Sequence, residues 1–84
     1  MAKLTSMMNI GNEMERKLTA VGIDSAEKLL AEGAEQAFSR LKAVYPQVCL
    51  VHLYALEGAV SQTELSSLSP GRKKELKSFS DSLQ

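Results

Sequence analysis

The run PQVCLVHLYALEGAV at residues 46–60 constrains the fold more than any other part of the sequence. Read as a helix, it is apolar nearly all round, so we expect it to lie at the buried centre of a bundle. Pro46 suits the first position of this helix, where its missing N–H costs no hydrogen bond. The stretch from Val48 to Leu56 is interrupted by His52 and falls far short of the ~20 residues that span a bilayer, so no membrane segment is expected.

A β-strand is the alternative interpretation of residues 48–54, VCLVHLY, because Val and Tyr favour sheets. The sequence contains no second strand-like run with which this segment would pair. Leu, Ala, Met, Glu and Lys also outnumber the β-branched residues, which favours helices. A chain of 84 residues buries only about 60% of its unfolded surface, so a single domain over residues 1–84 is expected.

The stretch between Gly11 and Gly22 predicts a short amphipathic helix. Its apolar positions recur at helical spacing: Met14, Leu18 and Val21. Gly22 suits the left-handed conformation past the helix end, and Ile23 is expected to fold back on Leu18, as in a Schellman motif.

A second helix is predicted from Ser25 to Glu32. Asp24 lies three residues before Glu27, and this spacing is typical of a capping box in which the Asp24 carboxylate caps the helix. We expect the helix to bury Ala26, Leu29 and Leu30.

Two further helices complete an all-α fold, predicted to be a compact five-helix bundle. One starts after Gly33 and ends at the Tyr45-Pro46 step, which disfavours a helical Tyr45; its apolar positions are Ala37, Phe38, Leu41, Val44 and Tyr45. The polar stretch SQTELSSLS is expected to be a loop with at most one turn of helix. The last helix is expected to begin at Ser69-Pro70, with Ser69 as its N-cap and Pro70 at its first helical position. The apolar stripe of this helix consists of Leu76, Phe79 and Leu83.

The turn Asn9-Ile10-Gly11 has the form of a helix-hairpin-helix turn, whose outer residues adopt backbone angles that side chains resist. Asn is the non-glycine residue that best tolerates the left-handed region, and Ile10 fits the central position that plugs the core. In DNA-binding versions of the turn, N–H groups at the next helix start hold a phosphate. Glu13 and Glu15 fall in that first turn and repel one. The turn is therefore either a phosphate site or a connection between two packed helices.

Sequence similarity extends well beyond this turn. It runs through NIGNEMERKLTAVGIDSAEKLLAEGAEQAFSRLKAVYPQVCLVHLYALEGAV and continues in LSPGRKKELKSF, and it covers residues 4–80. These segments resemble the C-terminal domain of the TfoX (Sxy) DNA-transformation proteins. The resemblance implies a fold related to helix-hairpin-helix and SAM-like domains and a role in the regulation of natural competence. The family has no established catalytic site, so the resemblance implies none here.

A basic cluster follows the Ser69-Pro70 cap: Arg72, Lys73, Lys74 and Lys77. Cations at a helix start are mildly unfavourable, so the cluster is a candidate for holding a phosphate, with a solvated helix surface as the alternative. Together with the turn, it completes the predicted nucleic-acid-binding set: Asn9, Ile10, Gly11, Arg72, Lys73, Lys74 and Lys77. The segments LTSMMNIG and LSSLSPG also share a Leu-x-x-apolar-turn-Gly pattern, so the chain ends resemble two related hairpins.

The single histidine and the single cysteine are expected to have structural roles. His52 is the only histidine and is expected to be a core residue bonded to a backbone group. Cys49, the only cysteine, is expected to be buried, and it excludes an internal disulfide, which suits a reducing cytoplasm. No metal site, cofactor, small-molecule substrate or catalytic group is predicted, because the sequence lacks a glycine-rich phosphate loop and a nucleophile paired with its base.

Two functional interpretations remain. The first is a small regulatory domain that contacts DNA through its hairpins. The second is a protein interaction module, with a partner or with itself, supported by ten basic and ten acidic residues that leave no net charge. Met7 and Met8 are candidates for a dimer seam, because methionine adapts to binding surfaces and so small a core gains from a partner.

Overall fold

Five α-helices and two 3₁₀ turns make up the fold in a computed structural model, which describes residues 2–83 apart from the side chain of Leu65. In chain order they are η1 (Leu4–Ser6), α1 (Asn12–Ala20), α2 (Ala26–Glu32), α3 (Ala34–Val44), α4 (Leu50–Ser61), η2 (Leu65–Ser67) and α5 (Pro70–Ser82). The described part contains no strand, and its radius of gyration, 11.6 Å, matches the ~12 Å expected of a compact chain of this length. The all-α prediction is confirmed, and the strand interpretation is wrong.

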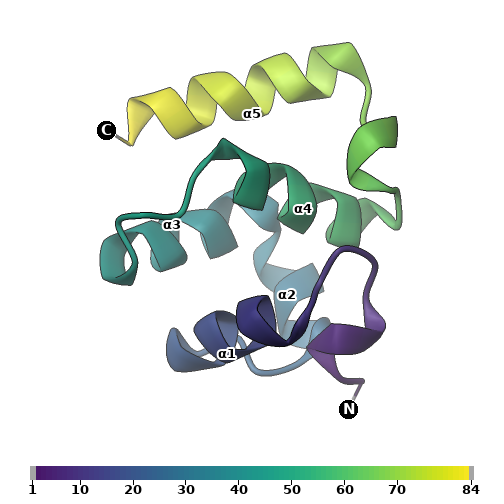
Figure 1. The fold of residues 1–84 in the computed structure, drawn as a ribbon, viewed down its shortest axis with the longest axis vertical. Coiled ribbons are helices and arrows are strands. Elements are labelled where there is room, and N and C mark those ends of the chain that lie inside the picture. The colour runs from purple at the N-terminus through teal and green to yellow at the C-terminus, as the bar shows by residue number, and fades with distance from the viewer. Residues whose placement is uncertain (1, 84) are drawn as a thin grey trace.

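Helix α4 is central, as the sequence predicted. It packs against α3, α5 and η2, and Figure 1 shows it below α5 and above α1 and α2. Its buried face consists of Leu53, Leu56 and Ala59, which are almost completely shielded from solvent. The helix is not enclosed on every side, however, because Val51 is 58% exposed.

The start of α4 corrects three expectations. The predicted helical start at Pro46 is wrong: the fully buried Val48 donates its N–H to the carbonyl of Tyr45 at 3.0 Å, so the chain turns there instead. Cys49 is the N-cap of α4, and its N–H donates to Nδ1 of His52 at 3.0 Å. His52 therefore bonds to the backbone as predicted, but it is half-buried and not in the core. Cys49 is exposed, so the expectation that it is buried is wrong.

The start of α2 also differs from the prediction. Ser25 is its N-cap, with Oγ accepting the N–H of Lys28 at 3.2 Å, so the predicted cap by Asp24 is wrong. Asp24 lies one residue too early, and its carboxylate pairs with Nζ of Lys28 at 3.3 Å. Glu27 does not close a capping box either, since its carboxylate accepts the N–H of Ala2 at 3.1 Å. That hydrogen bond lowers the pKa of Glu27 and ties α2 to the N-terminal segment.

The remaining helices largely follow their predicted faces. Gly22 has φ +91° and Ile23 donates its N–H to the carbonyl of Leu18 at 2.9 Å, which confirms the Schellman motif. The predicted apolar positions that are buried include Met14, Leu18, Ala26, Leu29, Ala37, Phe38, Leu41 and Leu76. Leu30 is 48% exposed, against expectation, because it lies about 100° around α2 from Leu29 and turns away from the core.

The hairpin before α1 crosses α4 at Gly58. Nδ2 of Asn9 donates to the carbonyl of Thr63 at 3.1 Å and lies directly over Gly58. A Cβ at position 58 would overlap Nδ2 of Asn9 and lie 2.5 Å from the Thr63 oxygen. Gly58 is thus required by the close approach of two segments that are distant in the sequence.

Among residues 2–83, no helix combines the length and the apolar character needed to cross a bilayer. The longest described helix, α5, has 13 residues.

We predict that Gly58→Ala destabilises the fold by about 1–3 kcal/mol through overpacking. The substitution acts against helix propensity, which alone would favour alanine by about 1 kcal/mol. Urea unfolding followed by circular dichroism measures the change. Gly71→Ala in α5 is the matched control, because a Cβ there has nothing within 4 Å, and it should be neutral or stabilising. A Gly58→Ala protein at least as resistant to urea as wild type would contradict the close approach.

Candidate binding surface around the hairpin

The hairpin turn combines one left-handed residue with one apolar plug. Asn9 has φ +70°, which confirms the left-handed residue of the turn, and Ile10 is only 6% exposed, which confirms the apolar plug. The expectation that Gly11 adopts a backbone conformation that side chains resist is wrong. As the N-cap of α1 it is extended, with φ −98°, and a Cβ there would meet nothing within 4 Å. The element before the turn is the 3₁₀ turn η1 and not an α-helix.

The first turn of α1 carries acidic side chains that are already engaged. Glu15 accepts the N–H of Thr5 at 3.3 Å. Glu13 pairs with Arg16, and the hydrogen bond and charge of Arg16 lower the pKa of Glu13. The side-chain amide of Asn9 likewise donates to the carbonyl of Thr63. The turn is therefore occupied by contacts within the protein, and two carboxylates lie where a phosphate would approach.

Arg72 is held by carboxylates from three helices. Its guanidinium lies 3.0 Å from Glu57, 3.5 Å from Glu75 and 3.7 Å from Glu35. The hydrogen bond to Glu57 is the main reason that the pKa of Arg72 is raised. This cation joins α3, α4 and α5, and its charge is neutralised within the fold.

The three lysines of the basic cluster lie within one arc of α5, because Lys77 follows Lys73 by four residues and Lys74 by three. Lys77 pairs with Asp81 at 3.6 Å. Lys73 and Lys74 form no ion pair with any residue of the described part of the chain. Lys73 also lines a groove on the protein surface. Two of the four basic residues, Arg72 and Lys77, are thus paired with carboxylates, and the predicted role of the cluster in nucleic-acid binding stays a prediction.

Two segments that each begin with a 3₁₀ turn border the groove that Lys73 lines. The similar segments LTSMMNIG and LSSLSPG both start with such a turn, η1 and η2, and both lead into a helix. The groove between them, here called the charged groove, has a volume of about 500 Å³. Its lining residues are Met8, Asn9, Tyr54, Glu64, Ser66 and Lys73. It brings together Asn9 and Lys73 from the predicted set, and not Ile10, Gly11, Arg72, Lys74 or Lys77.

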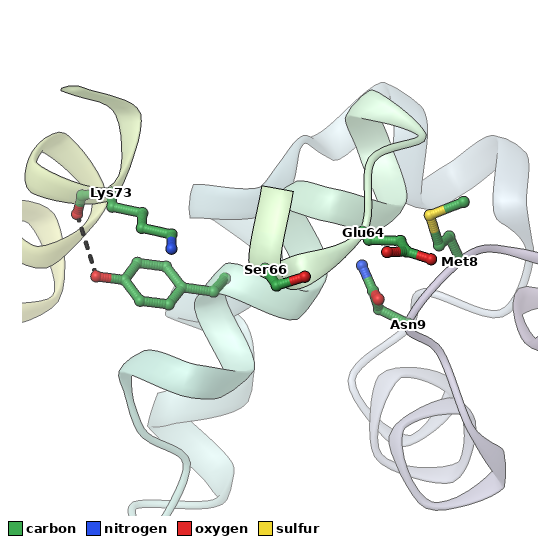
Figure 2. Close-up of a pocket in the computed structure, with 6 residues that line it drawn as sticks. Met8, Asn9, Glu64, Ser66 and Lys73 are labelled. Carbon is green, nitrogen blue, oxygen red and sulfur yellow. Dashed lines mark hydrogen bonds between the residues drawn. The ribbon is translucent and has the colours of Figure 1, made fainter. Parts of the chain in front are cut away.

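Figure 2 shows Lys73 at one end of the charged groove and Glu64, Asn9 and Met8 at the other, with Ser66 between them. The Tyr54 hydroxyl donates to the backbone carbonyl of Lys73 at 3.3 Å, which fixes the phenol beneath α5. The sequence did not single out Tyr54, Glu64 or Ser66. Their types are common on any surface, and only the approach of η2 and α5 to the hairpin places them together.

Met8 also lines a second groove, most of whose lining residues are apolar. This methionine groove has a volume of about 360 Å³. Its lining residues are Ser6, Met7, Met8, Ala26, Leu30, Ala59 and Gln62. Met8 is 43% exposed and lines both grooves, and Leu30 supplies a second accessible apolar side chain. We call the two grooves together the hairpin surface.

Cys49 and His52 form a local pair and not a metal centre. Sγ of Cys49 lies 3.5 Å from Nδ1 of His52. Within residues 2–83, no three His, Cys, Asp or Glu side chains gather closely enough to hold a metal ion. The contact serves the capping of α4.

Residues 1–80 match the model of the TfoX C-terminal domain. The chain belongs to this family. Its members are regulatory domains linked to competence, so the TfoX resemblance seen in the sequence is confirmed. The match covers almost the whole chain of 84 residues, from η1 through most of α5.

Two crystal structures of a protein of unknown function from Listeria monocytogenes are similar to this TfoX C-terminal domain. The triclinic form has a TM-score of 0.95 and 39% identity, over 98% of this chain and 93% of that one. The tetragonal form has a TM-score of 0.94 and 38% identity, over 98% of this chain and 100% of that one. No curated protein sequence matches the chain.

We predict that Arg72→Met lowers the free energy of unfolding by about 1–2 kcal/mol, because it leaves three carboxylates without their shared cation. Arg16→Met is the matched control: Arg16 and Glu13 form a single pair on the surface, so the loss should stay within about 0.5 kcal/mol. Urea unfolding of both variants measures the difference. Equal losses would show that Arg72 does not join the helices.

Proposed function

We propose that this TfoX C-terminal domain is a non-catalytic regulatory module that recognises a protein partner through its hairpin surface. The observation that carries the proposal is Met8, an exposed apolar side chain at the junction of two adjacent grooves. Methionine is flexible and polarizable, and it is common on surfaces that adapt to a protein partner. Leu30 adds accessible apolar area on the same surface.

The charge distribution favours a protein over DNA. Affinity for duplex DNA comes mainly from cations that neutralise phosphates. Arg72 and Lys77 are paired with carboxylates within the fold, and Glu64 lies in the charged groove. Lys73 and Lys74 remain, and two neighbouring lysines give a much weaker polyanion site than the predicted set of seven residues.

A photo-crosslinking amino acid at position 8, in the full chain and in its native cell, tests the proposal. We expect a covalent adduct that protease removes and nuclease does not, because the hairpin surface contacts protein. The same crosslinker at Ala20 is the matched control, since Ala20 is exposed on α1 and lines neither groove. After identification by mass spectrometry, the partner should bind the purified domain and bind Met8→Asp at least about tenfold more weakly.

Duplex DNA supplies the contrary outcome. Fluorescence anisotropy with a labelled duplex at about 50 mM and 200 mM salt should show no binding at the lower salt. Binding that weakens with salt and disappears in a Lys73→Glu, Lys74→Glu variant would overturn the protein-interaction proposal. Nuclease-sensitive adducts at position 8 would do the same.

A further inference from the structure

Glu64 is the one carboxylate of the described residues that has neither an ion pair nor a hydrogen bond with another of them. The remaining nine, each with an ion pair or a hydrogen bond, are Glu13, Glu15, Asp24, Glu27, Glu32, Glu35, Glu57, Glu75 and Asp81. Glu64, which lacks such a contact, lines the charged groove.

A lysine without a partner lines the same groove. Lys73 forms no ion pair within residues 2–83, and it lies near the N-terminus of α5, where the helix dipole disfavours a cation. Its own backbone carbonyl accepts from the Tyr54 hydroxyl. Figure 2 shows that Lys73 and Glu64 are at opposite ends of the groove, so they do not neutralise one another. The groove is therefore dipolar.

The surface between these two charges is suited to an apolar group. The Tyr54 hydroxyl is already bonded, which leaves the ring as half-buried apolar surface. Met8, which is 43% exposed, adds apolar surface at the Glu64 end of the groove. Ser66 and Asn9 add polar atoms that can bond to a peptide backbone.

We infer that the charged groove binds a peptide segment of the protein partner in which a basic and an acidic side chain flank an apolar one. The basic residue pairs with Glu64, the acidic residue pairs with Lys73, and the apolar residue between them packs on the ring of Tyr54. A nucleic acid fits less well, because its phosphates would be repelled by Glu64. The inference rests on the proposed function and adds the chemistry of the segment recognised.

A phage-displayed library of random dodecapeptides, selected on the purified full chain, provides the probe. Enriched peptides should share the charge pattern, and fluorescence anisotropy of one labelled peptide gives its Kd. We expect Glu64→Lys and Lys73→Glu each to weaken binding at least about tenfold, because each places like charges opposite one another. Lys74→Glu is the matched control, with the same change of charge on the next residue of α5, outside the groove, and its Kd should stay within about twofold.

A compensating exchange of charges separates recognition from damage to the fold. The Glu64→Lys, Lys73→Glu double variant should regain affinity for a peptide whose acidic and basic residues are exchanged. Circular dichroism confirms that each variant is folded before its Kd is measured.

Three outcomes would overturn the inference. Enriched peptides that bind all variants equally would place the protein contact elsewhere, and the proposed function would stand. A selection without enriched peptides would overturn it too, with the crosslink at position 8 deciding the proposed function separately. Duplex DNA that binds wild type and is lost equally in Lys73→Glu and Lys74→Glu would overturn both.

Discussion

The contact of the hairpin with α4 is the interaction on which the rest of the structure depends. Asn9 lies over Gly58 and donates to the carbonyl of Thr63, so one side chain joins the N-terminal hairpin, the last turns of α4 and the segment leading to η2. Its left-handed backbone positions Ile10 in the core next to it. Both grooves of the hairpin surface are bordered by these segments, so their shape follows from this contact.

Electrostatics organise the contacts of α5 with α3 and α4. Arg72 draws carboxylates from α3, α4 and α5 to one point, and smaller pairs such as Lys77 with Asp81 neutralise charge along a single helix. Among the described residues, five of the ten basic side chains form ion pairs with carboxylates of the fold. Among the charges without an ion pair, Glu64 and Lys73 gain importance because they line the charged groove together. This is why the protein-interaction interpretation is favoured over binding to a polyanion.

Local rules predicted the helices well, and they were wrong where two adjacent residues competed for one role. Both Asp24 and Ser25 are good N-cap residues, and the approach of Ala2 to Glu27 accompanies the cap at Ser25. Leu30 had the right residue type for the core, but Leu29 occupies that face and Leu30 is left in the methionine groove. Periodicity cannot separate two neighbours of equal hydropathy.

The sequence by itself determined the five helices, the Schellman motif at Gly22, the central place of α4 and the membership in the TfoX C-terminal family, because these follow from patterns within a few residues or along the whole chain. Only the tertiary structure decided which side chains share a surface. Tyr54, Glu64 and Lys73 come together because α4, η2 and α5 fold back toward the hairpin. Arg72 is not free to bind a phosphate because it pairs with carboxylates as distant in the sequence as Glu35, 37 positions away. Such distances are closed by packing, which no local pattern records.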